Sequence, residues 1–251
     1  MTPLNLEEVD TFVNNNISNF HDRRISILSN LTIKSLLSKN PYLFRAKNIS
    51  TAGELVESTM TAFLSSSEEK LFGGFLEELA VFVAGKTKNG RKSSSQGIDL
   101  EFTDDQVHYI VSIKSGQNWG NSSQHKKLAQ DFKSAQIRLK QSRHTSEVRA
   151  VLGICYGKAK TTIASENYYK IVGQNFWALI SGDRDLYKNI IEPVGYRAKE
   201  HNERYEKERC RIVNLLTRQF IERYCDASGN IDWQKIVEAN SGNYDLDKMQ
   251  L

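Results

Sequence analysis

The chain has 251 residues, of which 39% are hydrophobic and 25% charged, and its net charge is +4. This composition is typical of a globular protein with a buried core, and it excludes collagen-like, low-complexity and mostly disordered chains. No apolar run approaches the ~18 residues of a membrane helix, and the N-terminus lacks a signal-peptide pattern. Three cysteines, an odd number without close pairing, are expected as free thiols. We therefore expect a soluble cytoplasmic protein with no membrane partner.

The first part of the chain predicts helices. Over the first sixty residues they are joined by polar turns, with breaks at the three asparagines 14–16 and at Asn40-Pro41. Three serines at 65–67 followed by two glutamates predict a new helix start, because hydroxyls cap helix N-termini and acids favour the first turn. This helix continues with a wide apolar surface to a predicted end near Gly85.

The middle of the chain predicts a sheet. Strands that alternate apolar and polar residues are expected over 97–102 and 107–114, with a polar hairpin turn between them. A polar loop then leads into an amphipathic helix with Leu128, Phe132, Ala135 and Leu139 inward. The remaining predicted elements are a buried strand at 148–156, an apolar run of either type at 176–180, a charged helix at 196–224 with Ile212, Leu215, Leu216, Phe220 and Ile221 inward, and a short helix opened by Ile231-Asp232-Trp233. This order predicts an α/β core with helical additions at both ends.

Two charged residues on neighbouring strands carry the most chemical information. Asp99 is expected on the face opposite the apolar residues of its strand, and Lys114 on the corresponding face of the next strand, two residues beyond Ser112. Adjacent strands are only ~4.8 Å apart, so a carboxylate and an ammonium converge there. The carboxylate is a ligand for Mg²⁺, and the lysine suits orienting a water and offsetting phosphate charge. By itself, such a pair is most often an ordinary salt bridge. The flanking residues therefore decide whether the pair is structural or catalytic.

The flanking residues carry a resemblance. An aspartate, a lysine that ends a second strand, and a preceding helix with glutamates together resemble the PD-(D/E)xK nuclease superfamily. The stretch from Ser112 to Gln124, taken with Gly73-Gly74-Phe75-Leu76-Glu77-Glu78, is similar to type II restriction endonucleases, particularly a group that cuts GG-N-CC-type palindromes. The similarity extends from about residue 40 through Phe176-Trp177.

This resemblance implies a fold. It is a restriction-endonuclease-like α/β core with a mixed central β-sheet flanked by α-helices. We expect a single domain over residues 1–251, with a helical N-terminal part at about 1–64, the catalytic core at about 65–182 and a helical C-terminal part at about 183–251.

The resemblance also implies a site, with two departures from the family pattern. Gly97-Ile98 replaces the nominal proline before the aspartate, and Ser112 replaces an acidic residue, which removes one metal ligand. In this superfamily a neighbouring helix sometimes supplies the missing carboxylate. We prefer Glu77 for this role, and the alternatives are Glu78, Asp131 and Glu101. The implied catalytic set is Asp99, Lys114, Glu77 and Ser112, although Ser112 is more simply explained as a strand hydroxyl. The implied ligands of one or two Mg²⁺ ions are Asp99, Glu77 and the backbone carbonyl of Ile113.

The polar loop after Lys114 has two interpretations. It is either a helix-capping turn or a DNA contact, since Asn and Gln side chains pair bidentately with adenine and also contact phosphates. The candidate DNA-binding residues are Gln117, Asn118, Asn121, Ser122, Ser123, Gln124, Lys126 and Lys127.

The implied function is Mg²⁺-dependent, sequence-specific cleavage of double-stranded DNA that leaves 5′-phosphate and 3′-hydroxyl ends. It would belong to a prokaryotic restriction–modification system with a cognate methyltransferase that is not a stable subunit. A palindromic site implies a homodimer, because protein symmetry mirrors site symmetry. The alternatives are a structure-specific repair or junction nuclease on the same scaffold, a non-catalytic DNA-binding protein, and a structural protein in which the motif is coincidental.

Overall fold

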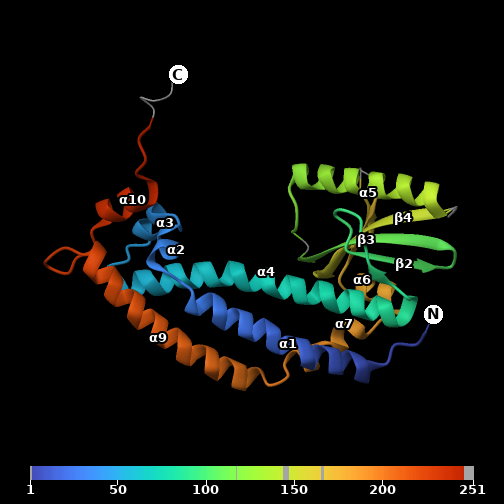
Figure 1. Cartoon of the computed structure of the whole chain (residues 1–251), viewed down its shortest axis with the longest axis horizontal. Helices are drawn as coiled ribbons and strands as arrows, with labels where there is room; N and C mark the ends of the chain where they lie inside the picture. Colours follow the sequence, from blue (N-terminus) through green and yellow to red (C-terminus); the bar gives the residue numbers. More distant parts are fainter. Residues whose placement is uncertain (1, 117, 144–146, 165–166, 246–251) are drawn as a thin grey trace. The chain divides into compact units, whose positions relative to one another are not determined.

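The computed structural model describes residues 2–116, 118–143, 147–164 and 167–245. It is a mixed α/β protein with a six-stranded mixed sheet and flanking helices, which confirms the predicted fold class (Figure 1). The chain forms two compact units. We call Met1–Asn19 with Leu71–Tyr196 the sheet unit, and Phe20–Lys70 with Arg197–Leu251 the helical unit. Most of the predicted core at 65–182 falls in the sheet unit, while the assignment of residues 1–251 to a single domain stays a prediction.

The sheet has the strand order β1-β2-β3-β4-β6-β5. Its strands are β1 (Arg91–Lys92), β2 (Leu100–Asp104), β3 (Val107–Gly116), β4 (Glu147–Tyr156), β5 (Thr162–Ile163) and β6 (Tyr169–Val172). The antiparallel β2–β3 pair places Leu100 opposite Val111, and the parallel β3–β4 pair places Lys114 opposite Ile154. The C-terminal ends of β3, β4 and β6 therefore share one edge of the sheet, since β4 and β6 are also parallel.

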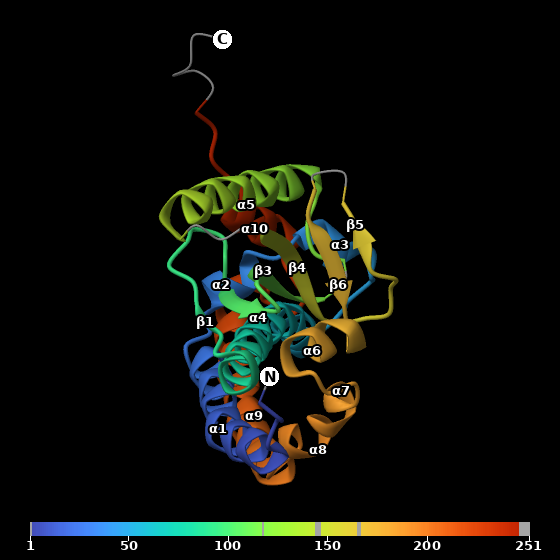
Figure 2. The same ribbon diagram turned by 90° about the vertical axis from the view of Figure 1, so that its right-hand side faces the viewer.

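Helices cover both faces of this sheet. Helix α5 (Ser122–Arg143) lies across one face, and α6 (Gln174–Ser181) with the C-terminal part of α4 (Ala52–Lys88) lies on the other (Figures 1 and 2). The four residues of α5 predicted to face inward are all buried, and they share a hydrophobic cluster with residues of β3 and β4. The apolar run at 176–180, which the sequence left open, is helical, and Trp177 donates to the Cys155 carbonyl at 2.8 Å.

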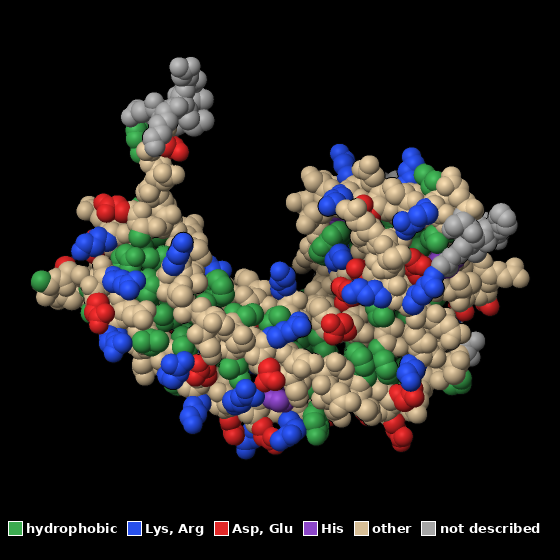
Figure 3. Space-filling model, viewed as in Figure 1, with side chains coloured by type: hydrophobic (Ala, Val, Ile, Leu, Met, Phe, Trp, Pro, Cys, Tyr) green, Lys and Arg blue, Asp and Glu red, His purple; other side chains and the backbone are tan. Residues whose placement is uncertain are grey.

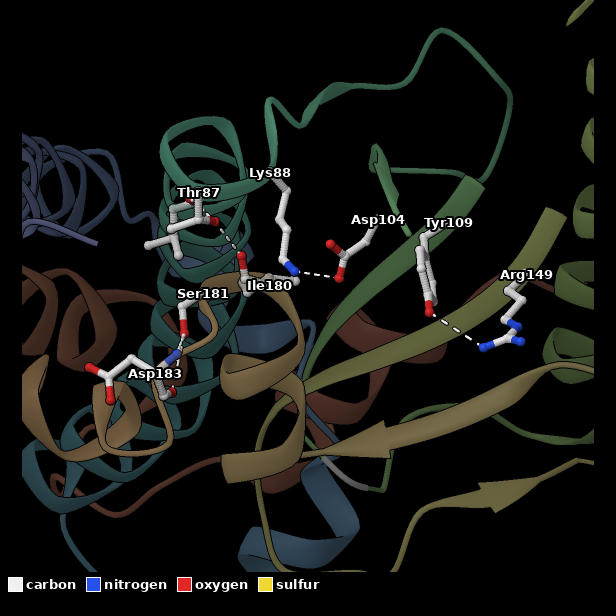
Figure 4. Close-up of polar contacts among 9 residues, drawn as sticks. Thr87, Lys88, Asp104, Tyr109, Arg149, Ile180, Ser181 and Asp183 are labelled. Atoms are coloured by element: carbon white, nitrogen blue, oxygen red, sulfur yellow. Dashed lines mark hydrogen bonds and ion pairs between the residues drawn. The ribbon is translucent and has the colours of Figure 1, made fainter. Parts of the chain in front are cut away.

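The C-terminal end of α4 is fixed to its neighbours by polar contacts (Figure 4). The Thr87 hydroxyl donates to the Ile180 carbonyl at 2.5 Å, and Lys88 pairs with Asp104 at the end of β2. The predicted hairpin turn is confirmed, and Asp105 and Gln106 occupy its two central positions with φ of 45° and 67°. Both positive angles match the primed turns that suit the twist of a hairpin. These contacts hold α4 against the strands that carry the predicted site.

The helical unit contains α2 (Ile33–Leu37), α3 (Pro41–Ala46), α9 (Ala198–Tyr224) and α10 (Trp233–Ser241), together with parts of α1 (Leu6–Ser29) and α4. Its core gathers side chains from all six helices, including Leu28, Leu36, Phe44, Met60, Leu216 and Ile236. The predicted boundary at Asn40-Pro41 is confirmed, because the Asn40 side chain caps α3. Ile221, predicted inward, is 48% exposed.

Two predicted helix boundaries are wrong. Helix α1 continues through residues 14–16, and α4 continues through residues 65–67. Ser66 donates its hydroxyl to the Ala62 carbonyl within the same helix, so it does not cap a new one. Val13 and Ile17 are buried on either side of the asparagines, and this burial outweighs the weak helix propensity of Asn. None of the helices that the structure describes combines the length and apolar character needed to span a bilayer.

Candidate active site

Asp99 and Lys114 meet where β2 and β3 pair. Asp99 directly precedes β2, and its N–H donates to the Val111 carbonyl at 2.9 Å. Its Oδ2 atom accepts from the Ile113 N–H at 2.6 Å and lies 3.4 Å from both Lys114 Nζ and Ser112 Oγ. The Asp99 and Lys114 side chains are 20% and 26% exposed, so both reach solvent. The structure therefore brings together the carboxylate and ammonium that the strand pattern predicted to converge.

Glu77 approaches this pair from α4. Its side chain is 30% exposed, and its Oε1 lies 3.9 Å from Lys92 Nζ. Burial raises the pKa of Glu77, and repulsion by Asp99 raises it further, while Lys92 and Lys114 oppose the shift. The next residue, Glu78, is exposed. Of the two neighbouring glutamates, Glu77 is thus the one that faces the Asp99 carboxylate.

The two other acidic candidates lie elsewhere. Glu101 is buried and engaged: its Oε1 accepts from the Ser93 hydroxyl at 2.5 Å, and its Oε2 lies 3.8 Å from Arg91. Asp131 approaches from α5 and packs beside Gly97, where an added Cβ would stand 2.5 Å from Asp131 Oδ2. Asp131 therefore lies against the loop before β2, and Glu101 is held by its own partners. Among the four acidic candidates, Glu77 of α4 is the one whose pKa is raised by the Asp99 charge.

The donor set fits a hard cation. In the described residues no three or more Asp, Glu, His or Cys side chains gather as a ligand cluster. The available carboxylates are those of Asp99 and Glu77. Magnesium is commonly bound by one or two carboxylates, with waters and substrate phosphate oxygens completing its octahedron. The repulsion between these two carboxylates is what a cation between them would relieve.

Cys155 is an uncharged residue near Asp99, Lys114 and Glu77. It is buried in β4, and burial with the nearby Glu77 charge raises the pKa of its thiol to about 12. It also lines an apolar pocket of about 540 Å³ with Leu76 and Trp177. All three cysteines of the chain are free thiols, as predicted. Cys155 therefore contributes an uncharged surface at neutral pH.

The polar loop after β3 is partly used for helix capping. Gln117 lies outside the described residues. Asn121 Oδ1 accepts from the Gln124 N–H at 3.0 Å, and Gln124 Oε1 accepts from the Asn121 N–H at 2.9 Å, a reciprocal cap on α5. The capping interpretation is therefore realised for these two side-chain oxygens. The described DNA-binding candidates, all exposed, are Asn118, Asn121, Ser122, Ser123, Gln124, Lys126 and Lys127.

The outer surface of α5 is basic. Figure 3 shows Lys and Arg side chains gathered over this helix. Asp131 is the single acidic residue within its bounds. The exposed cations of the described part of α5, which we call the α5 basic ridge, are Lys126, Lys127, Lys133, Arg138 and Lys140.

Two residues near the cluster were not predicted as site residues. Lys92 of β1 lies beside Glu77, although in sequence it is only one member of a basic group. The Trp119 ring lies beneath the Lys114 ammonium, 5.5 Å from ring centroid to Nζ. Trp119 is the tryptophan of the polar loop, five residues after the lysine, but its position in the sequence does not by itself predict this contact.

Comparison with known families places most of the chain in one family. The model of the family described as type II restriction endonuclease EcoO109I matches residues 7–202. Comparison with individual curated proteins gives no match. The matched range covers most of the chain and includes Glu77, Asp99 and Lys114. The chain therefore belongs to the type II restriction endonuclease EcoO109I family.

Proposed function

We propose that this protein cleaves both strands of double-stranded DNA at a specific short sequence, with Mg²⁺ as cofactor, leaving 5′-phosphate and 3′-hydroxyl ends. The family supports a nuclease that acts on DNA. The observation that carries the finer proposal is the meeting of Asp99, Lys114 and Glu77 at the end of the β2–β3 pair.

Each residue has a proposed role. Asp99 and Glu77 would hold Mg²⁺ together with the Ile113 carbonyl, and Glu77 supplies the carboxylate that Ser112 lacks. When bound, the ion supplies positive charge at the scissile phosphate and lowers the pKa of water. The Ile113 N–H and Ser112 hydroxyl both point at Asp99 Oδ2 and so fix its orientation. Lys114 positions the attacking water and offsets charge that develops on the phosphate.

The biological setting follows from this activity. The α5 basic ridge and the polar loop would contact DNA, since exposed lysines neutralise phosphates. A palindromic site of the GG-N-CC type would be cut by a homodimer. A cognate methyltransferase in the same restriction–modification system would protect the DNA of a prokaryotic host, in whose cytoplasm the enzyme would act.

The test is a digest of unmethylated plasmid and phage DNA with Mg²⁺, using the wild type, Asp99→Asn and Lys114→Ala. We expect discrete fragments from the wild type alone, with ligatable ends that map the site. Cutting that depends on DNA structure would favour a repair or junction nuclease. Binding without cutting, in Mg²⁺ or Mn²⁺, would favour a non-catalytic DNA-binding protein. Cutting that survives both substitutions would place the active site elsewhere.

A further inference from the structure

The Lys114 ammonium has two close partners, Asp99 and Trp119. Asp99 Oδ2 lies 3.4 Å from Nζ, and the Trp119 ring centroid lies 5.5 Å from it. A cation within about 6 Å of an indole face is attracted by the ring quadrupole, and tryptophan is the strongest such partner. The ammonium therefore has both a carboxylate and an aromatic face as partners.

The Trp119 ring is itself held in place. Its backbone N–H donates to the Gly116 carbonyl at 3.2 Å, so the loop turns back directly after β3. On the helix side, His125 meets the indole edge-on, with centroids 5.3 Å apart at 78°. His125 Nδ1 in turn shares a 2.7 Å hydrogen bond with the hydroxyl of Tyr168, which is 2% exposed. A buried anchor thus fixes the ring that contacts Lys114.

Gly120 makes this close approach of loop and helix feasible. Its φ is +92°, a conformation that residues with a Cβ rarely adopt. A Cβ at this position would stand 2.8 Å from His125 Nε2. The loop therefore closes onto α5 only because residue 120 is glycine, and this closure seats Trp119 between Lys114 and His125.

We propose that Trp119 is a positioning residue for Lys114: its indole, anchored through His125 and Tyr168, holds the ammonium beside Asp99. The inference rests on the proposed nuclease function. A lysine side chain has four rotatable bonds, and one partner leaves its ammonium free to swing away. A second, rigid contact restricts it to the place where it acts on the reacting phosphate.

The experiment compares Trp119→Leu and Trp119→Phe with the wild type. Two quantities are measured: the single-turnover cleavage rate with Mg²⁺, and the DNA dissociation constant with Ca²⁺ in place of Mg²⁺. We expect Trp119→Leu to lower the rate by about 3- to 30-fold, the range of a cation–π contact, while the dissociation constant changes less than about twofold. Trp119→Phe keeps an aromatic face, so its rate should lie closer to the wild type than to the Leu variant.

Leu139→Ala is the matched control. Leu139 is buried in the hydrophobic cluster against which Trp119 packs, but it lies near the other end of α5. This substitution should lower the melting temperature of the protein. At temperatures where the variant is still folded, its cleavage rate should equal that of the wild type. The inference is overturned by any of four results: an unchanged rate for Trp119→Leu, an equal rate loss for Leu139→Ala, a Phe variant as slow as the Leu variant, or a loss confined to DNA affinity. A wild type that does not cleave DNA overturns the proposed function, and this inference with it.

Discussion

Two carboxylates held close to each other in the sheet unit repel one another. Asp99 raises the pKa of Glu77, and burial of Glu77 acts in the same direction. This arrangement costs stability when no cation is bound, so we interpret it as functional. A purely structural pair would place opposite charges there.

The change Glu77→Gln tests this interpretation. It should lower the cleavage rate by at least about 100-fold, because a ligand charge is lost, yet leave the free energy of unfolding equal or slightly higher, because the repulsion is removed. Glu78→Gln is the matched control, since Glu78 is exposed on the next position of the same helix, and it should behave as wild type. Cleavage assays and urea unfolding decide the outcome, and equal losses for both variants would contradict the assignment.

His21 makes the helical unit sensitive to acid. Its ring stacks on His201 with centroids 4.2 Å apart, and Arg24 lies 3.4 Å from Nδ1. Burial first, and then the charges of His201 and Arg24, lower the pKa of His21 from 6.5 to about 4. Between pH 6.5 and 4 the unfolded chain binds a proton that the folded chain does not, so stability falls as the pH falls through this window.

The expected loss is about 1–3 kcal/mol after allowance for partial exposure of His21. Urea unfolding of the wild type and of His21→Phe, from pH 7 to pH 4.5, measures it. The Phe variant keeps an aromatic ring for the stack and cannot take up a proton, so its stability should fall less with acid. Parallel curves for the two proteins would refute the role of His21.

At the scale of elements, the sequence predicted the strands whose residues alternate between apolar and polar and the helix with amphipathic spacing. The β2–β3 pair and α5 follow from their own residues, and the pairing then brings Asp99 to Lys114. The choice between Glu77 and Glu78 depends on which side of α4 faces the sheet, and a helix with so wide an apolar surface does not reveal that side. The contacts of Lys92 and Trp119 arise from strand order and loop closure, which no local pattern encodes.

The continuity of α4 can be tested with Ser66→Ala. Ser66 is exposed and donates to a carbonyl within its own helix, so alanine, the better helix former, should leave stability unchanged or raise it by about 0.5 kcal/mol. Thr32→Ala is the comparison, because Thr32 caps α2 and its loss should cost about 1 kcal/mol. Thermal unfolding separates the two. A loss of about 1 kcal/mol at Ser66 would restore the interpretation of a helix start there.

At the scale of the whole molecule, DNA binding should be electrostatic. Removing one phosphate-neutralising cation from the α5 basic ridge should reduce the slope of log affinity against log salt by about 0.9. We therefore expect Lys126→Ala and Lys127→Ala each to lower the slope by about this amount on any DNA sequence. Lys199→Ala is the control, because Lys199 is 90% exposed on α9 in the helical unit. Slopes from fluorescence anisotropy that do not change for the α5 variants would remove this helix from the DNA-binding surface.

The interleaved order of the two units affects how the chain can be dissected. The family match ends at residue 202, near the start of α9, yet the core of the helical unit takes Tyr205, Ile212, Leu216, Phe220 and Ile236 from beyond that point. Those side chains pack with Leu28 and Met60, which lie inside the match. A gene fragment cut where the similarity stops would thus encode every proposed catalytic residue but would lack five of the sixteen described buried residues of this hydrophobic core. For this protein, the end of the family match is therefore not a position at which the chain can be truncated without disrupting a core.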